Sequence, residues 1–502
     1  MSLLLQDAPR WLFLLLTALL IGNVAGVVFV GAHTDEAYYW MLSQRPGLSY
    51  FDHPPLVPWM MRLFTALFGH DEVVFRLPAV IAWFVAAWAI FSISHQLSNN
   101  RQAAWVSLLV FASLPIFQAG FQIVGPDSGL MLFTALTYYC AIRAVNQQSA
   151  LWWLLAGICT GLGMLSKYNA VLVPFAVFLT LVLSKRGREQ MLTPWPWAAG
   201  FLALFCFIPV LIWNYQNEWA SFAFQWKHGT DIAPGSWYDN LSLYIINQMG
   251  VVLPWVFIAM VVAAVKAHHY ASYQNPYTLK LMRVGFAVPL VFFGVTGLLV
   301  KGQASWPAMA YIPGSILLGI ALNQWISKRW VAIIVMFSVM LSLVFVNLLR
   351  FPQWTSWFEK GTIPRSHISN TFGWEKILAE VEAIRAEEAI VAGNNCRIMA
   401  VPGYDNGGFP YYLLAAKLGV EYGNALRVTA APGGRLTQFD FWRKQETDKT
   451  PPVCVLITGP STRTNSPAEM IKDNKTWQRK NLVEITAPDG SVRWYGIYSQ
   501  KR

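Results

Sequence analysis

Three short acidic motifs lie at positions where charged side chains are rare in this chain. Asp35 and Glu36 follow a long apolar block in HTDEAYYW. Asp52 and His53 precede a stiff double proline in YFDHPPL, and Asp127 separates two apolar blocks in GPDSGLMLF. An ionised group in or near hydrocarbon costs several kcal/mol, so such residues are functional candidates. Carboxylates beside a rigid aromatic loop could position a general base that accepts a proton.

Cationic side chains also interrupt the apolar blocks, as Lys167 in MLSKYNAV, Lys301 in LLVKGQASWP and His228 in FQWKHG. Together with His53 they could neutralise a phosphate leaving group as its negative charge develops. Each has a plainer alternative, because lysines at span ends reach the interface and a lone histidine is more often neither ligand nor proton carrier.

The acidic residues have structural alternatives too. Asp35 and Asp127 could simply cap the helices that follow them. Asp52 with His228 could bind a divalent metal, since carboxylate and imidazole suit zinc. Two plausible ligands are too few for a site, and we predict no metal or other cofactor.

The composition indicates a membrane protein. Of the 502 residues, 55% are hydrophobic and only 13% are charged, against about 25% charged in soluble domains. Apolar blocks of spanning length predict about eleven transmembrane helices, the first of which we interpret as a retained span. Their predicted limits are 11–30, 74–97, 103–123, 128–146, 151–166, 169–184, 196–213, 243–265, 284–300, 305–323 and 330–350.

The basic residues between these blocks predict the orientation. With a cytoplasmic N-terminus, nearly every Lys/Arg cluster falls on one side, as the positive-inside rule requires. These residues are Arg101, Arg143, Lys185, Arg186, Arg188, Lys266, Lys280, Arg283, Lys328 and Arg329. The other side then receives the acidic motifs, residues 214–242, Lys167, Lys301 and the C-terminal tail. The net charge of +11 is therefore attributed to topology and lipid headgroups, and nucleic acid is not an expected partner.

The tail is predicted to be a separate α/β domain, which divides the chain into residues 1–350 and 351–502. Helical periodicity is expected over 373–388 and 410–418, and strands over 389–392, 453–458, 481–485 and 491–499. Cys140, Cys159 and Cys206 lie in apolar blocks and are expected to be inert. Cys396 and Cys454 lie in the tail, and their pairing is left open.

Read in order, the motifs resemble those of the GT-C superfamily. HTDEAYYW, YFDHPPL, GPDSGLMLF, LGMLSKYNAVL, FQWKHG and WPAMAYIP over residues 10–320 are similar to polyprenyl-phosphate-dependent transferases. The similarity is to aminoarabinose (lipid A) transferases and protein O-mannosyltransferases, and the tail motif RLTQFDFW also looks like bacterial members. The resemblance implies a GT-C-like fold, an all-α polytopic membrane domain with a C-terminal α/β periplasmic domain.

The resemblance also implies roles for individual residues. Asp35, with Glu36 beside it, would take the proton of an acceptor hydroxyl while that oxygen attacks the anomeric carbon. Departure of the lipid phosphate would invert that centre, and Asp127 would orient the base or the acceptor. His53 replaces a lysine of the family, and because neutral histidine is common at pH 7, Lys167 fits the phosphate role better. Tyr168 beside it, Asp52, Lys301 and His228 complete the expected donor site.

The function predicted is therefore an inverting glycosyltransferase of the bacterial inner membrane. It would move a sugar from undecaprenyl phosphate to lipid A, lipopolysaccharide or another glycolipid at the periplasmic face. Membrane lipids are expected to surround the protein as partners. A protein O-mannosyltransferase stays open, as the apolar chain suits either acceptor. A lipid-linked sugar flippase is less favoured, because transport predicts inverted repeats and charges near mid-span. An assembly protein would not need acids and cations on one face, and no phosphate-binding glycine loop indicates a soluble nucleotide-sugar enzyme.

Overall fold

The computed structural model forms two compact units, and each is described by itself. One unit comprises residues 1–29, 47–60 and 76–346, and the other comprises residues 30–46, 61–75 and 347–502. We call them the membrane unit and the C-terminal unit. The residues that the structure describes are 10–29, 33–230, 236–267, 275–300, 302–325, 330, 333–334, 337–342, 374–392, 397–401, 428–430, 438–444, 453–458, 477–486 and 492–500.

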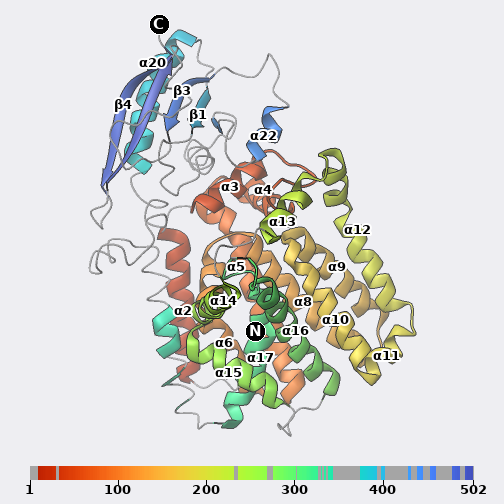
Figure 1. The fold of residues 1–502 in the computed structure, drawn as a ribbon. Coiled ribbons are helices and arrows are strands. Elements are labelled where there is room, and N and C mark those ends of the chain that lie inside the picture. Colours follow the sequence, from red (N-terminus) through yellow and green to blue (C-terminus); the bar gives the residue numbers. More distant parts are fainter. Residues whose placement is uncertain are drawn as a thin grey trace. The chain divides into compact units, whose positions relative to one another are not determined.

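The membrane unit is built from helices (Figure 1), several of which are apolar. Within the described ranges, four are long and apolar enough to cross a membrane, or up to six if each of two bent pairs is one span. The four are α5 (Glu72–Ser98), α8 (Pro126–Gln147), α12 (Trp195–Gln216) and α16 (Pro276–Thr296). The bent pairs are η1 and α10 (Tyr168–Leu183) with α11 (Lys185–Met191), and α14 (Trp237–Val252) with α15 (Pro254–Lys266).

The remaining helices of this unit are shorter. They are α2 (Arg10–Phe29), α6 (Arg101–Ser113), α7 (Pro115–Gln122), α9 (Ala150–Ser166), α13 (Ala220–Thr230) and α17 (Tyr311–Trp325). Helices α2 and α9 coincide closely with predicted spans, whereas α17 begins six residues after the predicted start of the span 305–323. The predicted span 103–123 is instead broken at Leu114, because proline at position 115 lacks the N–H that would continue the helix. Residues 243–265 likewise bend by 100° before Pro254. The full count of about eleven stays a prediction.

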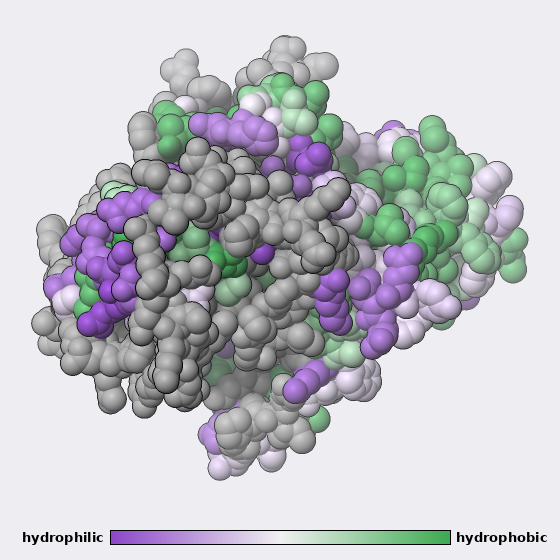
Figure 2. Space-filling view, turned by 90° about the horizontal axis from the view of Figure 1, so that it is seen from above, coloured by the Kyte–Doolittle hydropathy of each residue, from purple (hydrophilic) through white to green (hydrophobic). Residues whose placement is uncertain are grey.

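Small residues let the membrane helices approach closely. A Cβ on Gly157 of α9 would come within 2.4 Å of the Ala199 carbonyl oxygen of α12. One on Gly161, four residues later, would come within 2.5 Å of Cys206 Cβ. This small-xxx-small spacing is typical of helix pairs in membranes, where packing rather than hydrophobicity drives association. Figure 2 shows hydrophobic side chains gathered on the side where α12 lies, and Phe201 and Phe205 of α12 are 73% and 68% exposed.

The C-terminal unit contains a five-stranded sheet in the order β2-β1-β3-β5-β4. Strands β1 (Arg397–Val401), β2 (Val428–Ala430) and β3 (Val453–Thr458) are parallel, and β4 (Trp477–Thr486) and β5 (Val492–Gln500) are antiparallel. Helix α20 (Trp374–Ala392) packs on β3, β4 and β5 through its buried side chains. The unit also holds α22 (Gln438–Arg443), α3 (Thr34–Gln44) and the second half of α4 (Leu56–Phe68).

The tail prediction holds in most of its described parts and fails in one. The helix over 373–388 and the strands over 453–458, 481–485 and 491–499 are confirmed. The strand expected over 389–392 is wrong, because the helical apolar period of Ile377, Val381 and Ile384 carries α20 on to Ala392. Strands β1 and β2 were not predicted. The helix expected over 410–418, most of the span over 330–350 and Cys396 lie outside the described residues.

The cysteines divide between the two units. Cys454 in β3 is disulfide-bonded. Cys140, Cys159 and Cys206 in the membrane unit are free.

Candidate functional site

A partly buried ion pair joins two of the predicted site residues in the membrane unit. Lys167 Nζ lies 2.7 Å from Asp127 Oδ1, and the two side chains are 9% and 35% exposed. Asp127 stands in the first turn of α8, where the helix dipole favours a carboxylate. Lys167 is the C-cap residue of α9, directly after its last helical residue. The ammonium has three N–H donors and Asp127 accepts one, so donors remain for oxygens of a bound anion.

The local packing explains why these motifs meet across 40 residues of sequence. Ser166 Oγ donates to the Pro126 carbonyl at 2.8 Å. A Cβ on Gly129 would lie 2.3 Å from Ser166 Oγ, so only glycine allows this approach of α8 to the end of α9. GPDSG and LSKYN therefore form one interlocked element that holds the ion pair.

A second set of polar residues fixes the backbone beside this pair, and of its members the sequence analysis named Tyr168 but missed Asn214 and Ser221. The Tyr168 and Ser221 hydroxyl oxygens lie 2.8 Å apart. Buried Asn214, near the end of α12, accepts the Phe222 N–H at 3.2 Å through its Oδ1. The only sequence signal was the polar run NYQN after a long apolar block. These contacts connect α12 and α13 to the turn that follows Lys167.

The loop that carries Asp52 packs against the same region. Gln225 of α13 donates to the Asp52 carbonyl oxygen at 2.7 Å, and the Phe51 and Phe224 ring centroids are 4.9 Å apart. Asp52 is 4% exposed and His53 is half-buried. Leu56 joins an apolar cluster with Leu165, Phe207 and Val210. The structure thus gathers four of the sequence motifs, around residues 52, 127, 167 and 225, in one unit.

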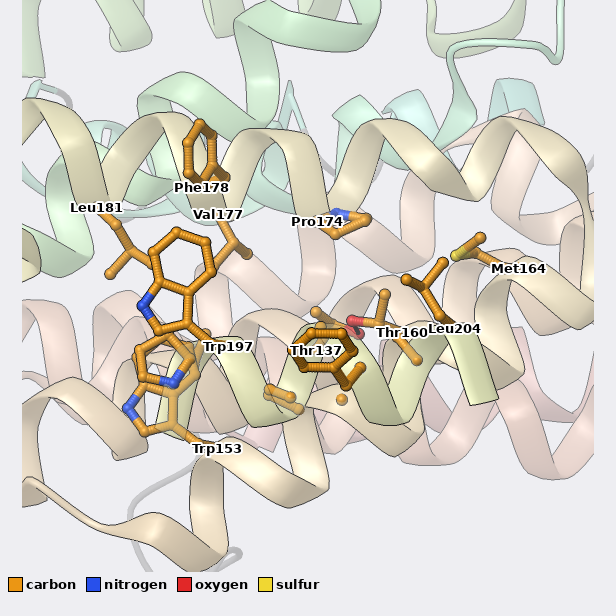
Figure 3. A pocket seen from close by; sticks show the side chains of 18 of the residues that line it. Thr137, Trp153, Thr160, Met164, Pro174, Val177, Phe178, Leu181, Trp197 and Leu204 are labelled. Carbon is orange, nitrogen blue, oxygen red and sulfur yellow. Dashed lines mark hydrogen bonds between the residues drawn. The ribbon is translucent and has the colours of Figure 1, made fainter. Parts of the chain in front are cut away.

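An apolar cavity of about 430 Å³ lies between α8, α9, α10 and α12 (Figure 3). Met164 and Val171, on either side of Lys167 in sequence, line it. Figure 3 shows Met164 and Leu204 at one end, and Trp153 and Trp197 at the other. Nearly all of its wall is carbon, so it suits a hydrocarbon chain rather than a polar ligand. We call it the chain groove.

The first acidic motif lies in the C-terminal unit. The Asp35 side chain is 63% exposed in the first turn of α3, and its Oδ2 is 3.6 Å from His33 Nδ1. Glu36 is fully buried and accepts the His33 N–H at 2.9 Å, which completes a capping box with the His33 side chain. The sequence analysis overlooked His33 as the cap. Asp35 is therefore the carboxylate presented to solvent, and Glu36 is the one that stabilises the helix start.

Two predicted site residues fall outside what the structure describes. Lys301 is one, and His228 is the other, although the backbone of helix α13 is described at that position. Among the described residues, no group of three or more His, Cys, Asp or Glu side chains could hold a metal ion.

Known proteins match the chain in sequence. The family model for dolichyl-phosphate-mannose-protein mannosyltransferase matches residues 52–213. Lipid A galacturonosyltransferase RgtD of Rhizobium johnstonii is 26% identical over 291 residues, which cover 56% of this chain and 59% of that protein. An undecaprenyl phosphate-alpha-4-amino-4-deoxy-L-arabinose arabinosyl transferase of Pseudomonas fluorescens is 23% identical, over 58% of this chain and 51% of that protein. The chain thus spans between half and three fifths of these relatives.

Solved structures match it in fold. ArnT from Cupriavidus metallidurans bound to undecaprenyl phosphate gives a TM-score of 0.64 at 14% identity, covering 98% of both chains. The arabinofuranosyltransferase AftD from Mycobacteria gives 0.51 at 12% identity, covering 99% of this chain and 40% of that one. The chain therefore has the ArnT fold, mostly helical with a small C-terminal sheet. The resemblance to GT-C glycosyltransferases that the motifs predicted is confirmed.

Proposed function

We propose that this protein is an inverting glycosyltransferase that moves a sugar from undecaprenyl phosphate to lipid A, lipopolysaccharide or another envelope glycolipid. The observations that carry the proposal are the Lys167–Asp127 ion pair and the hydrocarbon-lined chain groove, whose lining residues Met164 and Val171 are three and four positions from Lys167 in sequence. A prenyl phosphate has a matching pair of parts, an anionic phosphate for the cation and a hydrocarbon chain for the groove. The sequence relatives, whose names specify lipid A and undecaprenyl-phosphate sugars, support this donor and acceptor.

The donor would bind with its phosphate at Lys167 and its chain along the groove. Met164 of the groove wall lies three residues before Lys167 in sequence, and Val171 lies four residues after it, so a lipid phosphate would meet the ammonium while its first isoprene units enter the groove. Asp127 holds the ammonium in place and offsets its charge when no donor is bound. Asp52, His53, Lys301 and His228 would complete the donor site, and Tyr168 would support it by holding the turn after Lys167 through Ser221.

The chemical step would use Asp35 as the general base. The acceptor oxygen attacks the anomeric carbon, its proton passes to the Asp35 carboxylate, and the bond from that carbon to the phosphate oxygen breaks. The bonding electrons leave with the phosphate, whose charge Lys167 compensates. An exposed carboxylate at the start of a capped helix is accessible to an incoming hydroxyl. Glu36 supports the helix start, and Asp127 orients the reacting groups.

The proposed setting is the bacterial inner membrane, with about eleven spans, a cytoplasmic N-terminus and a periplasmic domain over residues 351–502. The one-sided distribution of Lys and Arg supports this orientation. The disulfide of Cys454 supports it independently, because disulfides persist in oxidising compartments such as the periplasm.

A second candidate is transfer of the sugar to a protein. The family model that matches residues 52–213 is that of a protein mannosyltransferase. The chain groove would bind the lipid donor of either reaction. The two candidates differ only in which acceptor, a glycolipid or a protein, gains the mass of the sugar.

Mass spectrometry of envelope lipids and proteins, with and without the gene, tests both candidates. We expect one lipid A or glycolipid mass to lose a single sugar when the gene is deleted, and to regain it with the wild-type chain but not with Asp35→Asn. A lost sugar on a protein would instead favour the second candidate. No difference in any lipid or protein, under conditions where the chain is present in the membrane, would overturn the proposal.

A further inference from the structure

Within the C-terminal unit, a tail helix packs on the helix that begins with Asp35. The Gln438 N–H of α22 donates to the Tyr38 hydroxyl of α3 at 3.3 Å, 400 positions away in sequence. The Tyr38 and Phe439 ring centroids are 6.4 Å apart. The guanidinium carbon of Arg45 lies 4.6 Å from the centre of the Trp442 ring. We call this set of contacts the α3–α22 seam.

The seam engages one face of each helix. Tyr38 lies within α3 and Arg45 is the residue that caps the C-terminal end of α3, while Phe439 and Trp442 are three residues apart on α22. Tyr38, Phe439 and Trp442 are all buried. The backbone, aromatic and cation–π contacts therefore constrain α3 at Tyr38 in its middle and at Arg45 at its C-terminal end, so that rotation or sliding of the helix would break one of them.

From this we propose that Phe439 and Trp442 are positioning residues that set the direction of Asp35. The inference rests on the proposed function, in which Asp35 is the base. Helix α3 has only 11 residues, and a helix of that length is marginal alone, so its orientation depends on what packs on it. Arg62 of α4 also holds it, through the Ser43 carbonyl at 3.3 Å. General-base catalysis needs near-exact placement, and an error of about 1 Å can cost roughly a hundredfold.

The seam gives the sheet domain a part in the chemistry. Helix α22 contacts the edge strand β2, so the sheet, α22 and α3 form a continuous chain of contacts that reaches Tyr38, three residues after Asp35. The tail would therefore be needed for the rate of the chemical step, and not only for recognition of the acceptor.

The test compares substitutions of aromatic residues in the full-length chain. Trp442→Leu removes the ring over Arg45, Phe439→Ala removes the ring beside Tyr38, and Trp442→Tyr keeps an aromatic face for Arg45. Trp477→Leu is the matched control, because Trp477 packs in a separate apolar cluster with Leu456 and Tyr498 on the sheet. For each variant we would measure kcat, the affinity for undecaprenyl phosphate by native mass spectrometry, and amide exchange over residues 34–44.

Trp442→Leu and Phe439→Ala should lower kcat at least tenfold and raise amide exchange over 34–44 at least tenfold. Affinity for undecaprenyl phosphate should stay within twofold, since Lys167 belongs to the other unit. Trp442→Tyr should recover most of both losses, and Trp477→Leu should change neither by more than threefold.

Unchanged exchange in Trp442→Leu would overturn the inference, as would raised exchange with unchanged kcat. Equal losses in Trp477→Leu would show a general effect of tail stability and overturn it too. Absence of sugar transfer by the wild type would instead overturn the proposed function and with it the catalytic half of the inference, while the exchange data would still decide whether the seam holds α3.

Discussion

The two candidate acids are held in opposite ways. Asp127, in the membrane unit, is tied to Lys167 at 2.7 Å and only a third of its side chain is exposed. Asp35, in the C-terminal unit, is 63% exposed at a helix start that the buried Glu36 stabilises. One carboxylate is thus fixed by its partner, whereas the other is fixed by its backbone and leaves its oxygens accessible.

This difference separates two chemical tasks. A general base must reach the hydroxyl from which it takes a proton, so an accessible carboxylate on a rigid element suits it. A carboxylate bonded to a buried cation suits the holding and balancing of that cation, because removing one partner leaves the other uncompensated. The comparison therefore agrees with the proposed roles, in which Asp35 takes the proton and the Lys167–Asp127 pair binds the donor.

Asp35→Asn should have the largest effect. Loss of the proton acceptor should lower transfer by roughly 10²–10⁴-fold, while the exposed site leaves folding unchanged. The measurement is the amount of glycosylated acceptor formed by purified membranes, with protein level as the control. Glu36→Gln is the matched variant, because glutamine still offers an oxygen to the His33 N–H, and its loss should stay below tenfold. The reverse order of these two losses would make Glu36 the base.

Lys167→Met should have the second-largest effect, which is a loss of donor affinity. A charge-assisted hydrogen bond contributes about 1.5–3 kcal/mol, so the affinity for undecaprenyl phosphate should fall roughly 10–100-fold. Asp127→Asn should weaken it less, since the cation remains.

The double variant of these two residues tests the ion pair itself. Contacting residues usually show coupling of about 0.5–3 kcal/mol, so the losses should not add. Additive losses, or unaltered binding in Lys167→Met, would separate the pair from the phosphate.

Much of the membrane unit could be predicted because hydrocarbon thickness sets the length of apolar blocks. Helices α2, α5, α8 and α9 lie close to their predicted limits. The interruptions were harder to predict. The break before Pro115 and the bend before Pro254 follow from proline at a helix start, but continuous hydropathy across these positions masked them.

The sequence predicted which residue types form the site, but only partly which of these residues contact each other. Asp127 and Lys167 were both singled out, but their pairing depends on the approach of Ser166 to Gly129, which no spacing rule gives. The membership of Asp35 in the C-terminal unit could not be predicted either. It rests on contacts such as that between Tyr38 and Gln438, which are 400 residues apart. Ser221 and Gln225 were missed because uncharged polar residues in an aromatic stretch give little signal.

Gly129→Ala tests the interlock that brings Asp127 and Lys167 together. The added Cβ would lie 2.3 Å from Ser166 Oγ and 2.9 Å from Ser166 Cβ, so α8 and α9 must separate. Overpacking of this kind costs about 1–3 kcal/mol, which should lower the melting temperature in detergent and weaken donor binding. Gly125→Ala in the same motif is the control, because nothing lies within 4 Å of its Cβ position. Equal melting temperatures for the two variants would show that the interlock adds no stability.

Tyr168→Phe should have the smallest effect and sharpens the contrast between fixed and accessible groups. If the Tyr168 hydroxyl serves only to hold the turn after Lys167 through Ser221, its loss costs about one hydrogen bond, near 1 kcal/mol. Ser221→Ala should then give the same small decrease in melting temperature and in transfer, and the double variant should be no worse than either. A loss of transfer of about a hundredfold in Tyr168→Phe alone would mean that the hydroxyl contacts the substrate. In that case the membrane unit would contribute an accessible polar group of its own, and the division between holding and reacting residues would no longer follow the division between the two units.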